Sequence, residues 1–304
     1  MEKRAFDAHI KAGNIAAEVQ KLARQRAKPG VKLLDLANEI ESKTRELGGE
    51  VAFPVNLSRN NEAAHYTPSF NDELIIEEKD LLKIDIGVHV DGYICDAAFT
   101  IDFSGKNALL VEAVNSALAA AVELAKPGCN VREIGKAIEH EITSRGLKPV
   151  SNLCGHAVQQ YHLHAGISIP NVESGNYVLE EGDTFAIEPF ATNGYGEIVE
   201  GDDVEIFLLK KMGASARLPA TRQVLTKIEE LYSELPFAKR WLHTALPNLS
   251  QLSVSFAFKE LMNLDILASY PVLIEKKRGL VAQAETTIIV TEDGCLPTAP
   301  VPTV

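Results

Sequence analysis

Two aspartates on either side of a hairpin turn have the spacing of a metal site. Residues 83–101 read KIDIGVHVDGYICDAAFTI, in which β-branched runs flank Asp91-Gly92, a pair that favours a two-residue turn. This turn places Gly87 opposite Asp96. Asp85 and Asp96 therefore lie on one face as diagonal neighbours, about 7–8 Å apart at Cα, while the apolar residues point to the other face. The second face is predicted to be core, and the first carries two carboxylates.

Like charges held this close repel one another, and apolar neighbours also deprive each of them of hydration. The pair must therefore either share a proton or bind cations. Metal is the favoured interpretation, since the ions of a dinuclear site lie about 3.5–4 Å apart and carboxylates at diagonal positions can converge on them. A hairpin whose acids simply face water is the alternative that this stretch alone leaves open.

The composition is that of a soluble globular protein with a sizeable core. Of the 304 residues, 46% are hydrophobic and 24% are charged, and the length allows one large or two ordinary domains. The net charge of −12 argues against nucleic acid or an anionic membrane as the main partner, because both require a basic surface. The sequence has no signal-like apolar N-terminus, no apolar run of about 18 residues, and no C-x-x-C pair among its four cysteines. A reducing cytoplasm is the expected location.

The chain contains an internal repeat that predicts two similar halves. Ala-Lys-Pro-Gly occurs at 27–30 and again at 125–128, each time between two predicted helices. Further on, EEKDLLKID ends at Asp85 and EEGDTFAIE ends at Glu188. A pseudo-two-fold arrangement of these halves would place Asp85 and Glu188 across a common cleft. The helices are expected at 6–27, 33–47, 107–124 and 131–145.

The second half carries a long insertion within its hairpin. Asp96 follows Asp85 by 11 residues, whereas the alternating strand VAQAETTIIV at 281–290 places Glu285 97 residues after Glu188. We expect the additional 86 residues to form a small helical subdomain beside the cleft, with a structural role preferred to ligand binding for the insert as a whole. Its helices are predicted at 220–235, 238–243 and 253–263.

Three histidines cluster near a strand end in the second half. His156 follows a short apolar run and a glycine, and the HLHAG segment adds His162 and His164. Together with His65 they flank the candidate strands. The other four are expected to be structural or solvent-facing: His9, His140 and His243 on helices facing solvent, and His89 near the hairpin tip.

Four carboxylates and one imidazole form the candidate site: Asp85, Asp96, His156, Glu188 and Glu285. Such a set suits hard to borderline divalent ions such as Mn²⁺, Fe²⁺, Co²⁺ or Zn²⁺ and disfavours Cu⁺. Four negative ligands balance two divalent cations, and a bridging water would lose a proton near neutral pH. The residues therefore predict a dinuclear hydrolase centre.

The same residues resemble a known family. The ligand order Asp, Asp, His, Glu, Glu is similar to that of the methionine aminopeptidase fold, called pita-bread, which prolidase, aminopeptidase P and creatinase share. Nearly the whole chain resembles the type II methionine aminopeptidases of peptidase family M24, through AFPVNLSRNNEAAHYTP at 52–68, GH-x7-HAG at 155–166, and the helical insertion before Glu285. The resemblance implies an α+β, pseudo-two-fold pita-bread fold. Residues 1–195 and 277–304 would form the catalytic domain, and 196–276 the inserted helical subdomain.

Carried over residue by residue, the resemblance implies that the five residues above bind two ions of cobalt, manganese, iron or zinc, with Asp96 and Glu285 bridging them. His65 and His164 would hydrogen-bond the substrate and the tetrahedral intermediate. The positions that match the pocket for the methionine side chain, an apolar slot suited to an unbranched thioether, are Phe53, Leu163 and Tyr270.

The implied activity is removal of the N-terminal methionine from peptides and nascent chains that have a small second residue. A metal-bridging hydroxide would attack the first peptide bond, and Glu188 would pass a proton to the leaving amine. From the resemblance we also expect a monomeric cytoplasmic enzyme that works near the ribosome and has no direct nucleic-acid or membrane partner. Thr286, where histidine is common, and Cys154, where a small or amide residue is common, depart from the pattern and bear on metal preference and rate.

Three other functions compete with this one. X-Pro peptidases share the ligands but usually carry an extra N-terminal domain, which we do not expect here because the first ligand stands at Asp85. Binding proteins of this fold lack ligands and often add basic tails, whereas all five ligands are present and the last residues are uncharged. In a structural metal protein the four carboxylates would bind metal, but His65 and His164 would have no substrate to contact.

Overall fold

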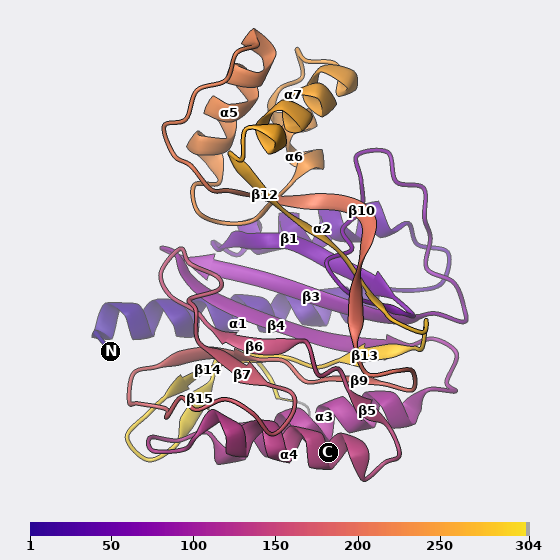
Figure 1. Cartoon of the computed structure of the whole chain (residues 1–304), viewed down its shortest axis with the longest axis vertical. Helices are drawn as coiled ribbons and strands as arrows, with labels where there is room; N and C mark the ends of the chain where they lie inside the picture. The colour runs from indigo at the N-terminus through magenta and orange to yellow at the C-terminus, as the bar shows by residue number, and fades with distance from the viewer. Residues whose placement is uncertain (302–304) are drawn as a thin grey trace.

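The predicted hairpin is present and forms the centre of the first half (Figure 1). The computed structural model describes residues 1–301. Its hairpin strands pair antiparallel with Gly87 opposite Asp96, the predicted register. Asp91 and Gly92 have φ values of 52° and 84°, which the two-residue turn requires. The paired strands are β3 (Leu81–Val90) and β4 (Tyr93–Asp102).

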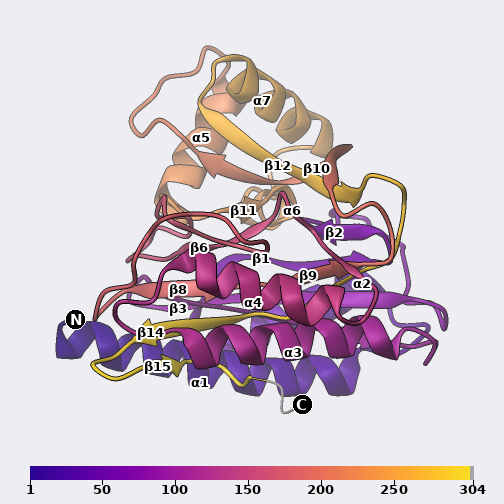
Figure 2. The ribbon, with the colours of Figure 1, turned by 60° about the horizontal axis from the view of Figure 1, so that its bottom comes forward.

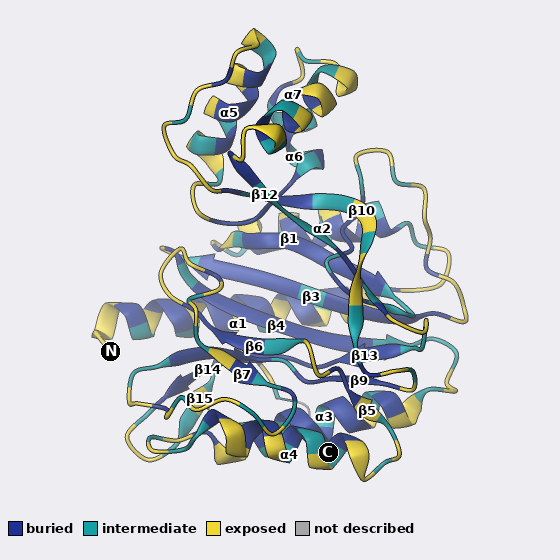
Figure 3. Ribbon diagram, viewed as in Figure 1, coloured by how far each residue is buried: buried dark blue, intermediate teal, exposed yellow. Residues whose placement is uncertain are grey.

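Two helices cover the apolar face of this sheet. The core between this face and helices α1 and α2 contains Ile84, Ile86 and Val88 of β3. In Figure 3 most of the sheet has the dark blue colour of buried residues. The chain turns after α1 at Pro29-Gly30, where Gly30 has φ 90°. No helix within residues 1–301 is long and apolar enough to cross a membrane. The elements of this layer are α1 (Lys3–Arg26), α2 (Leu33–Glu46) and β1 (Glu50–Arg59), which pairs with β3.

The second half repeats this plan. α3 and α4 pack against each other on one side of its strands (Figure 2), in one core with Phe185, Ile187 and Ile288. The turn between these helices contains Gly128 at φ 84°, the counterpart of Gly30. The predicted repeat is therefore present, with strands ordered β15-β14-β8-β6-β7 and β13-β9-β5. The elements are α3 (Ala108–Leu124), α4 (Val131–Thr143), β5 (Lys148–Pro149), β6 (Cys154–Ala157), β7 (Ser168–Pro170), β8 (Thr184–Ile187), β9 (Phe190–Thr192), β13 (Val281–Gln283), β14 (Thr286–Val290) and β15 (Cys295–Pro297).

The strand predicted at 281–290 is interrupted. Ala284 and Glu285 separate β13 from β14, so the prediction of one continuous strand is wrong. Glu285 instead exchanges two backbone hydrogen bonds with Ala98 of β4: its N–H donates at 2.9 Å and its carbonyl accepts at 3.3 Å. The second half attaches to the first at this point, and the attachment brings Glu285 beside the aspartates of the hairpin.

The insert forms a separate layer, which stands at the top of Figure 1. β10 leads into it and β12 leads back, and the two strands pair with each other. Its helices enclose a core of their own that includes Val224, Leu242 and Val254. The three predicted helices are present, and the domain boundaries at 196 and 276 stay a prediction. The elements are β10 (Ile198–Leu209), α5 (Pro219–Leu231), β11 (Phe237–Ala238), α6 (Lys239–Ala245), α7 (Gln251–Asn263) and β12 (Leu267–Glu275), in a sheet ordered β11-β10-β12-β2 that ends at β2 (Glu62–Ala64).

The prediction that His9 faces solvent is wrong. The inner side of α1 lies on the hairpin, and His9 is only 3% exposed there. Its Nδ1–H donates to the Ile94 carbonyl at 3.0 Å, and its ring meets Tyr93 edge-on. His243 is half-buried rather than solvent-facing, whereas His140 is exposed as predicted. Helix position alone could not reveal that the hairpin tip covers His9.

Glu275, at the end of β12, fastens the base of the insert. Its buried carboxylate accepts backbone hydrogen bonds from Tyr195, Gly196, Lys277 and Gly279, the last three at 3.1, 2.7 and 2.8 Å. Burial raises the pKa of Glu275, but these donors together lower it more, so the net shift is downward. Glu275→Gln should lower the free energy of unfolding at pH 7 by about 2 kcal/mol, because a hydrogen bond to a charged group contributes about 1.5–3 kcal/mol.

This deficit of Glu275→Gln should depend on pH. A carboxylate whose pKa is depressed in the folded state stabilises above its unfolded value of about 4.3, and that stabilisation is lost as the pH falls through the folded pKa. Urea unfolding at pH 7 and pH 3 should therefore show the gap between wild type and variant closing in acid. Glu200→Gln, at an exposed position of β10, is the control. A gap that does not change with pH would contradict a role for the charged form.

Candidate metal centre

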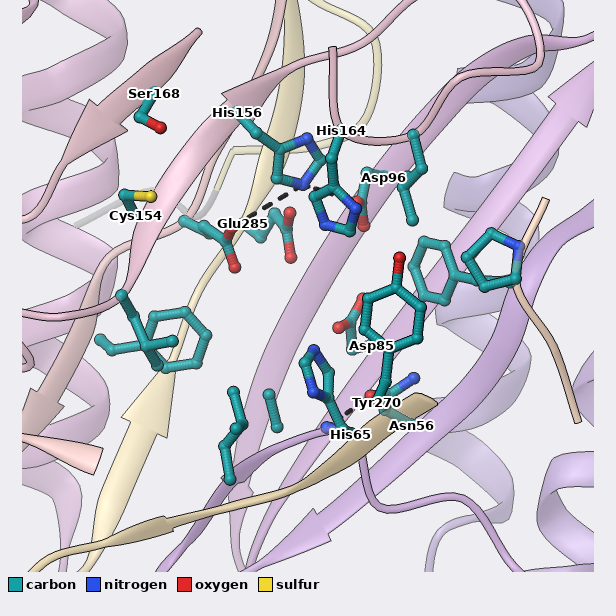
Figure 4. A pocket seen from close by; sticks show the side chains of 18 of the residues that line it. Asn56, His65, Asp85, Asp96, Cys154, His156, His164, Ser168, Tyr270 and Glu285 are labelled. Carbon is teal, nitrogen blue, oxygen red and sulfur yellow. Dashed lines mark hydrogen bonds and ion pairs between the residues drawn. The ribbon is translucent and has the colours of Figure 1, made fainter. Parts of the chain in front are cut away.

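The five candidate ligands converge on one cavity between the two halves, and Figure 4 shows the labelled ones pointing into the same space. Asp85 and Asp96 come from β3 and β4 of the hairpin. His156 comes from β6, Glu188 directly follows β8, and Glu285 stands at the break between β13 and β14. The structure therefore brings together all five residues that the hairpin, the repeat and the histidine cluster predicted.

The shortest separations in this cluster surround His156. Its Nε2 lies 3.5 Å from Asp96 Oδ2 and 3.8 Å from Glu188 Oε1. One ligand atom from each of Asp96, His156 and Glu285 lies within 4.8 Å of the other two. His156 Nδ1–H donates to the Ala157 carbonyl at 3.4 Å, and burial lowers the pKa of His156 to about 4. The ring is therefore neutral, and Nε2 turns a lone pair rather than a proton toward the carboxylates.

All four carboxylates have raised pKa values, and burial is the main cause for each of them. Burial raises the pKa of Asp96 to about 7. Burial and the charges of neighbouring carboxylates raise the pKa of Asp85, Glu188 and Glu285 well above the ordinary range. Asp85 Oδ1 and Asp96 Oδ1 are buried and find no hydrogen-bond partner among residues 1–301. Unsatisfied acids around a neutral imidazole form a donor set that divalent cations complete.

Two residues that the sequence analysis missed hold the ligands in place. Gln283 donates its Nε2–H to Glu285 Oε2 at 3.0 Å. Thr287 Oγ1 accepts the backbone N–H of Asp96 at 2.8 Å and donates to the Asp96 carbonyl at 3.0 Å. Both stand two positions from Glu285. Residues two apart in a strand point to the same face, so this spacing was the signal that could have identified them.

The ligands open into a cavity of about 330 Å³ that the other predicted site residues line. Tyr270 packs between His65 and His164, with ring centroids 5.4 Å and 6.0 Å away (Figure 4). Phe53 and Leu163 are buried and supply an apolar surface. All five predicted substrate-binding residues therefore surround the space next to the ligands.

His65 is held in a fixed orientation on the wall of this cavity. Its backbone has φ 67°, and its N–H donates to Asn56 Oδ1 at 2.7 Å. Its Nδ1–H donates to the Pro271 carbonyl at 3.1 Å, and burial lowers the pKa of His65 to about 4. The neutral ring thus presents Nε2 as a hydrogen-bond acceptor. The ring of His164 lies 4.3 Å from that of His156, and burial, followed by the neighbouring histidines, lowers the pKa of His164.

The insert also contributes to the cavity, as the assignment of Tyr270 to the pocket predicted, and the structural role of the insert as a whole stays a prediction. Ile206 and Pro236 line the cavity together with Tyr270. Their approach depends on how the insert folds back, which no local pattern reports. Of the two departures from the family pattern, Cys154 lines the cavity, whereas Thr286 is buried and donates its hydroxyl to the Ala299 carbonyl at 3.0 Å.

Known proteins resemble the chain in sequence and in fold. The model of metallopeptidase family M24 matches residues 7–232. The methionine aminopeptidase of Pyrococcus horikoshii is 48% identical over 289 residues, which cover 94% of this chain and 97% of that protein. Among solved structures, a thermophilic Arx1 has a TM-score of 0.86 at 16% identity, covering 100% of this chain and 93% of its own. The methionine aminopeptidase of Rickettsia prowazekii has a TM-score of 0.71 at 19% identity, covering 99% and 98%.

These findings confirm the predicted fold and the predicted resemblance. The two solved structures share the fold over nearly the full chain, although their sequences have diverged. The family model spans well over half of the chain, and the Pyrococcus protein matches it almost from end to end. With this likeness, and with carboxylates and one imidazole gathered in its cleft, the chain belongs to metallopeptidase family M24.

Proposed function

We propose that this protein removes the N-terminal methionine from peptides and nascent proteins. The observation that carries the proposal is a cluster of buried acids and one histidine that opens directly into a cavity with an apolar side. An N-terminal residue entering this cavity places its side chain against Phe53 and Leu163 and its first peptide bond beside the acids. The 48% identity to a methionine aminopeptidase supports the same activity.

We assign two divalent ions per chain to the centre, of cobalt, manganese, iron or zinc. The unsatisfied oxygens of Asp85 and Asp96 support this number, because they add free donor atoms to the three that already cluster. When bound, the ions supply polarisation of the scissile carbonyl and the acidity that makes water nucleophilic at neutral pH. The residues that would hold the ions are Asp85, Asp96, His156, Glu188 and Glu285.

The cavity selects methionine and a small second residue. Tyr270 and Phe53 offer aromatic surfaces to a thioether, which makes favourable contacts with ring edges and, being unbranched, enters a narrow slot. A volume of about 330 Å³ is near the lower end of ligand sites, which span about 300–1,000 Å³. Methionine accounts for only part of this volume, and the small second residue is proposed from the likeness to methionine aminopeptidases.

Three side chains handle the protons and the developing charge. Glu188, whose Oε1 lies 3.8 Å from His156 Nε2 within the cluster, passes a proton to the leaving amine. His65, with Nε2 as acceptor, orients a substrate N–H. His164 supplies a donor to the carbonyl oxygen, where negative charge accumulates.

Peptide cleavage tests the proposed function. Metal-stripped protein is incubated with Met-Ala-Ser, Met-Pro-Ser, Leu-Ala-Ser and Ala-Pro-Ser, before and after addition of Mn²⁺, Fe²⁺ or Co²⁺, and the released amino acids are measured. Metal-dependent release of methionine alone is the expected result. Cleavage of Ala-Pro-Ser would assign the chain to the X-Pro peptidases, and bound metal without any cleavage would assign it to the binding proteins of this fold.

Removal of the metal should also lower stability. Folding without cations leaves four carboxylates buried side by side, whereas a ligand at 100 times its dissociation constant adds about 2.7 kcal/mol to the free energy of unfolding. Calorimetric melting of chelator-treated protein should therefore show a lower melting temperature that Mn²⁺ restores. An Asp96→Asn variant serves as the control, since Mn²⁺ should raise its melting temperature much less than that of the wild type.

We further propose a monomeric cytoplasmic enzyme that acts close to the ribosome. The four free cysteines support a reducing compartment, and nascent chains with intact N-terminal methionine are available where they emerge. Sedimentation of the pure protein and fractionation of cell extracts on sucrose gradients test the two parts separately.

A further inference from the structure

A buried ion pair joins the insert to the first half of the chain. Glu41 lies on α2 and Arg240 on α6, and their side chains are only 4% and 3% exposed. The pair is part of a larger network. Trp241 Nε1–H donates to the same Glu41 carboxylate at 2.8 Å, and the Val55 N–H donates to it at 3.4 Å. Two elements 199 positions apart are thus fixed to each other.

The second terminal nitrogen of the guanidinium, Nη1, extends the network to the loop that carries His65. Arg240 Nη1 donates to Thr67 Oγ1 at 2.6 Å and to the Pro68 carbonyl at 3.2 Å. Thr67 in turn donates its hydroxyl to the Val55 carbonyl at 2.8 Å. Since Thr67 follows His65 by two positions, the network ends beside one wall of the cavity.

On the insert side the network begins beside the part of the cavity lining that the insert supplies. α6 directly follows Ala238, which pairs with Ile206, and Ile206 pairs with Tyr270 on the next strand. Pro236 stands just before this segment, and Ile206, Pro236 and Tyr270 all line the cavity. Leu235, the next residue back, belongs to the same buried apolar cluster as Phe53.

Stability alone does not account for this arrangement. The desolvation of two buried charges often cancels their attraction, and an apolar pair of similar volume can stabilise equally well. An apolar pair does not fix the relative orientation of the two segments that it joins. A planar guanidinium does fix it, because its N–H donors point in set directions and each acceptor must lie along one of them.

We propose that the Glu41–Arg240 pair sets the position of the cavity-lining part of the insert relative to β1, which carries Phe53, and thereby the preference for an unbranched methionine side chain over a branched one. Both are positioning residues that act through Val55 and Thr67 in the first half and through β11 and β10 in the insert. The inference rests on the proposed function, because methionine is the side chain that the pocket holds.

The test compares removal of one charge with removal of both. Glu41→Gln and Arg240→Met each leave a buried partner unpaired and should lower the melting temperature. The double variant Glu41→Leu/Arg240→Met should recover most of it. The double variant should nevertheless have a KM for Met-Ala-Ser about ten-fold above that of the wild type, equivalent to about 1.4 kcal/mol. Its kcat should stay within about two-fold of the wild-type value. The ratio of kcat/KM for Met-Ala-Ser to that for Leu-Ala-Ser should be smaller than in the wild type.

A double variant with wild-type melting temperature, KM and selectivity would overturn the proposal, since the pair would then be structural only. Should that variant not fold, Arg240→Lys keeps the charge but cannot reach Glu41 and Thr67 together, and it should show the same rise in KM. Asp265→Asn, which removes exposed ion pairs at the end of β10 and β12 far from Glu275, is the matched control.

Binding measurements separate this proposal from the proposed function. Calorimetry with L-methionine and L-leucine on Mn²⁺-loaded protein measures selectivity without turnover. A wild type that cleaves no methionine peptide would contradict the proposed function, whereas equal discrimination between the two amino acids by wild type and Arg240→Lys would contradict the role of the pair.

Discussion

The Asp96→Asn enzyme is expected to release methionine from Met-Ala-Ser at least about 100-fold more slowly than the wild type, since even the indirect partners of a metal ligand cost about 10–100-fold when removed. Asp96 has the central position in the cluster. Its Oδ2 lies 3.5 Å from His156 Nε2. Its backbone N–H and carbonyl are both hydrogen-bonded to the Thr287 hydroxyl. The amide has nearly the same shape, so the fold should persist while one negative ligand is lost.

Metal content distinguishes this loss from unfolding. Mass spectrometry of the intact variant after Mn²⁺ loading should show fewer bound ions than in the wild type, while circular dichroism stays the same. Asp91→Asn, at the exposed tip of the same hairpin, offers a matched control that should change neither property. Full occupancy by two ions in an Asp96→Asn protein that still turns over would remove Asp96 from the ligand set.

The register of the hairpin could be predicted because local rules determine it. Asp91-Gly92 admits one short turn, and that turn fixes every pairing between β3 and β4, including the shared face of Asp85 and Asp96. Glu188 could be predicted for a different reason. The repeat places it at the equivalent end of a strand, and the structure brings its Oε1 to 3.8 Å from His156 Nε2 in the same cluster.

What the sequence could not predict depends on contacts between distant segments. The break at Glu285 arises because its backbone pairs with Ala98 of the other half. His9 is buried only because the hairpin tip happens to lie under its helix. The contact between Glu41 and Arg240 joins two helices that each look self-sufficient, and no periodicity in either one requires a partner. Local patterns thus identify the ligands, whereas the walls around them depend on tertiary packing.

Alanine in place of His164 should lower kcat for Met-Ala-Ser by about 100-fold or more, because a single preorganised donor to a developing oxyanion contributes about 10²–10³ in rate. The ring stands beside His156 with centroids 4.3 Å apart and faces the carboxylates in Figure 4, yet none of the closest contacts among the acids involves it. The variant should therefore keep both ions, and His140→Ala, on the exposed side of α4, should keep both ions and full activity.

The same measurement on His65→Ala separates binding from chemistry. Because Nε2 of His65 is an acceptor, its removal should raise KM as well as lower kcat, whereas loss of the His164 donor should act mainly on kcat. Metal content measured beside the kinetics decides whether each histidine acts in catalysis or in metal binding. If either alanine variant lost its ions together with its activity, the histidine would belong to the metal site, and if both kept wild-type turnover, neither histidine would have a catalytic role. Retained metal with lost turnover is the outcome that only a catalytic role for these two rings explains.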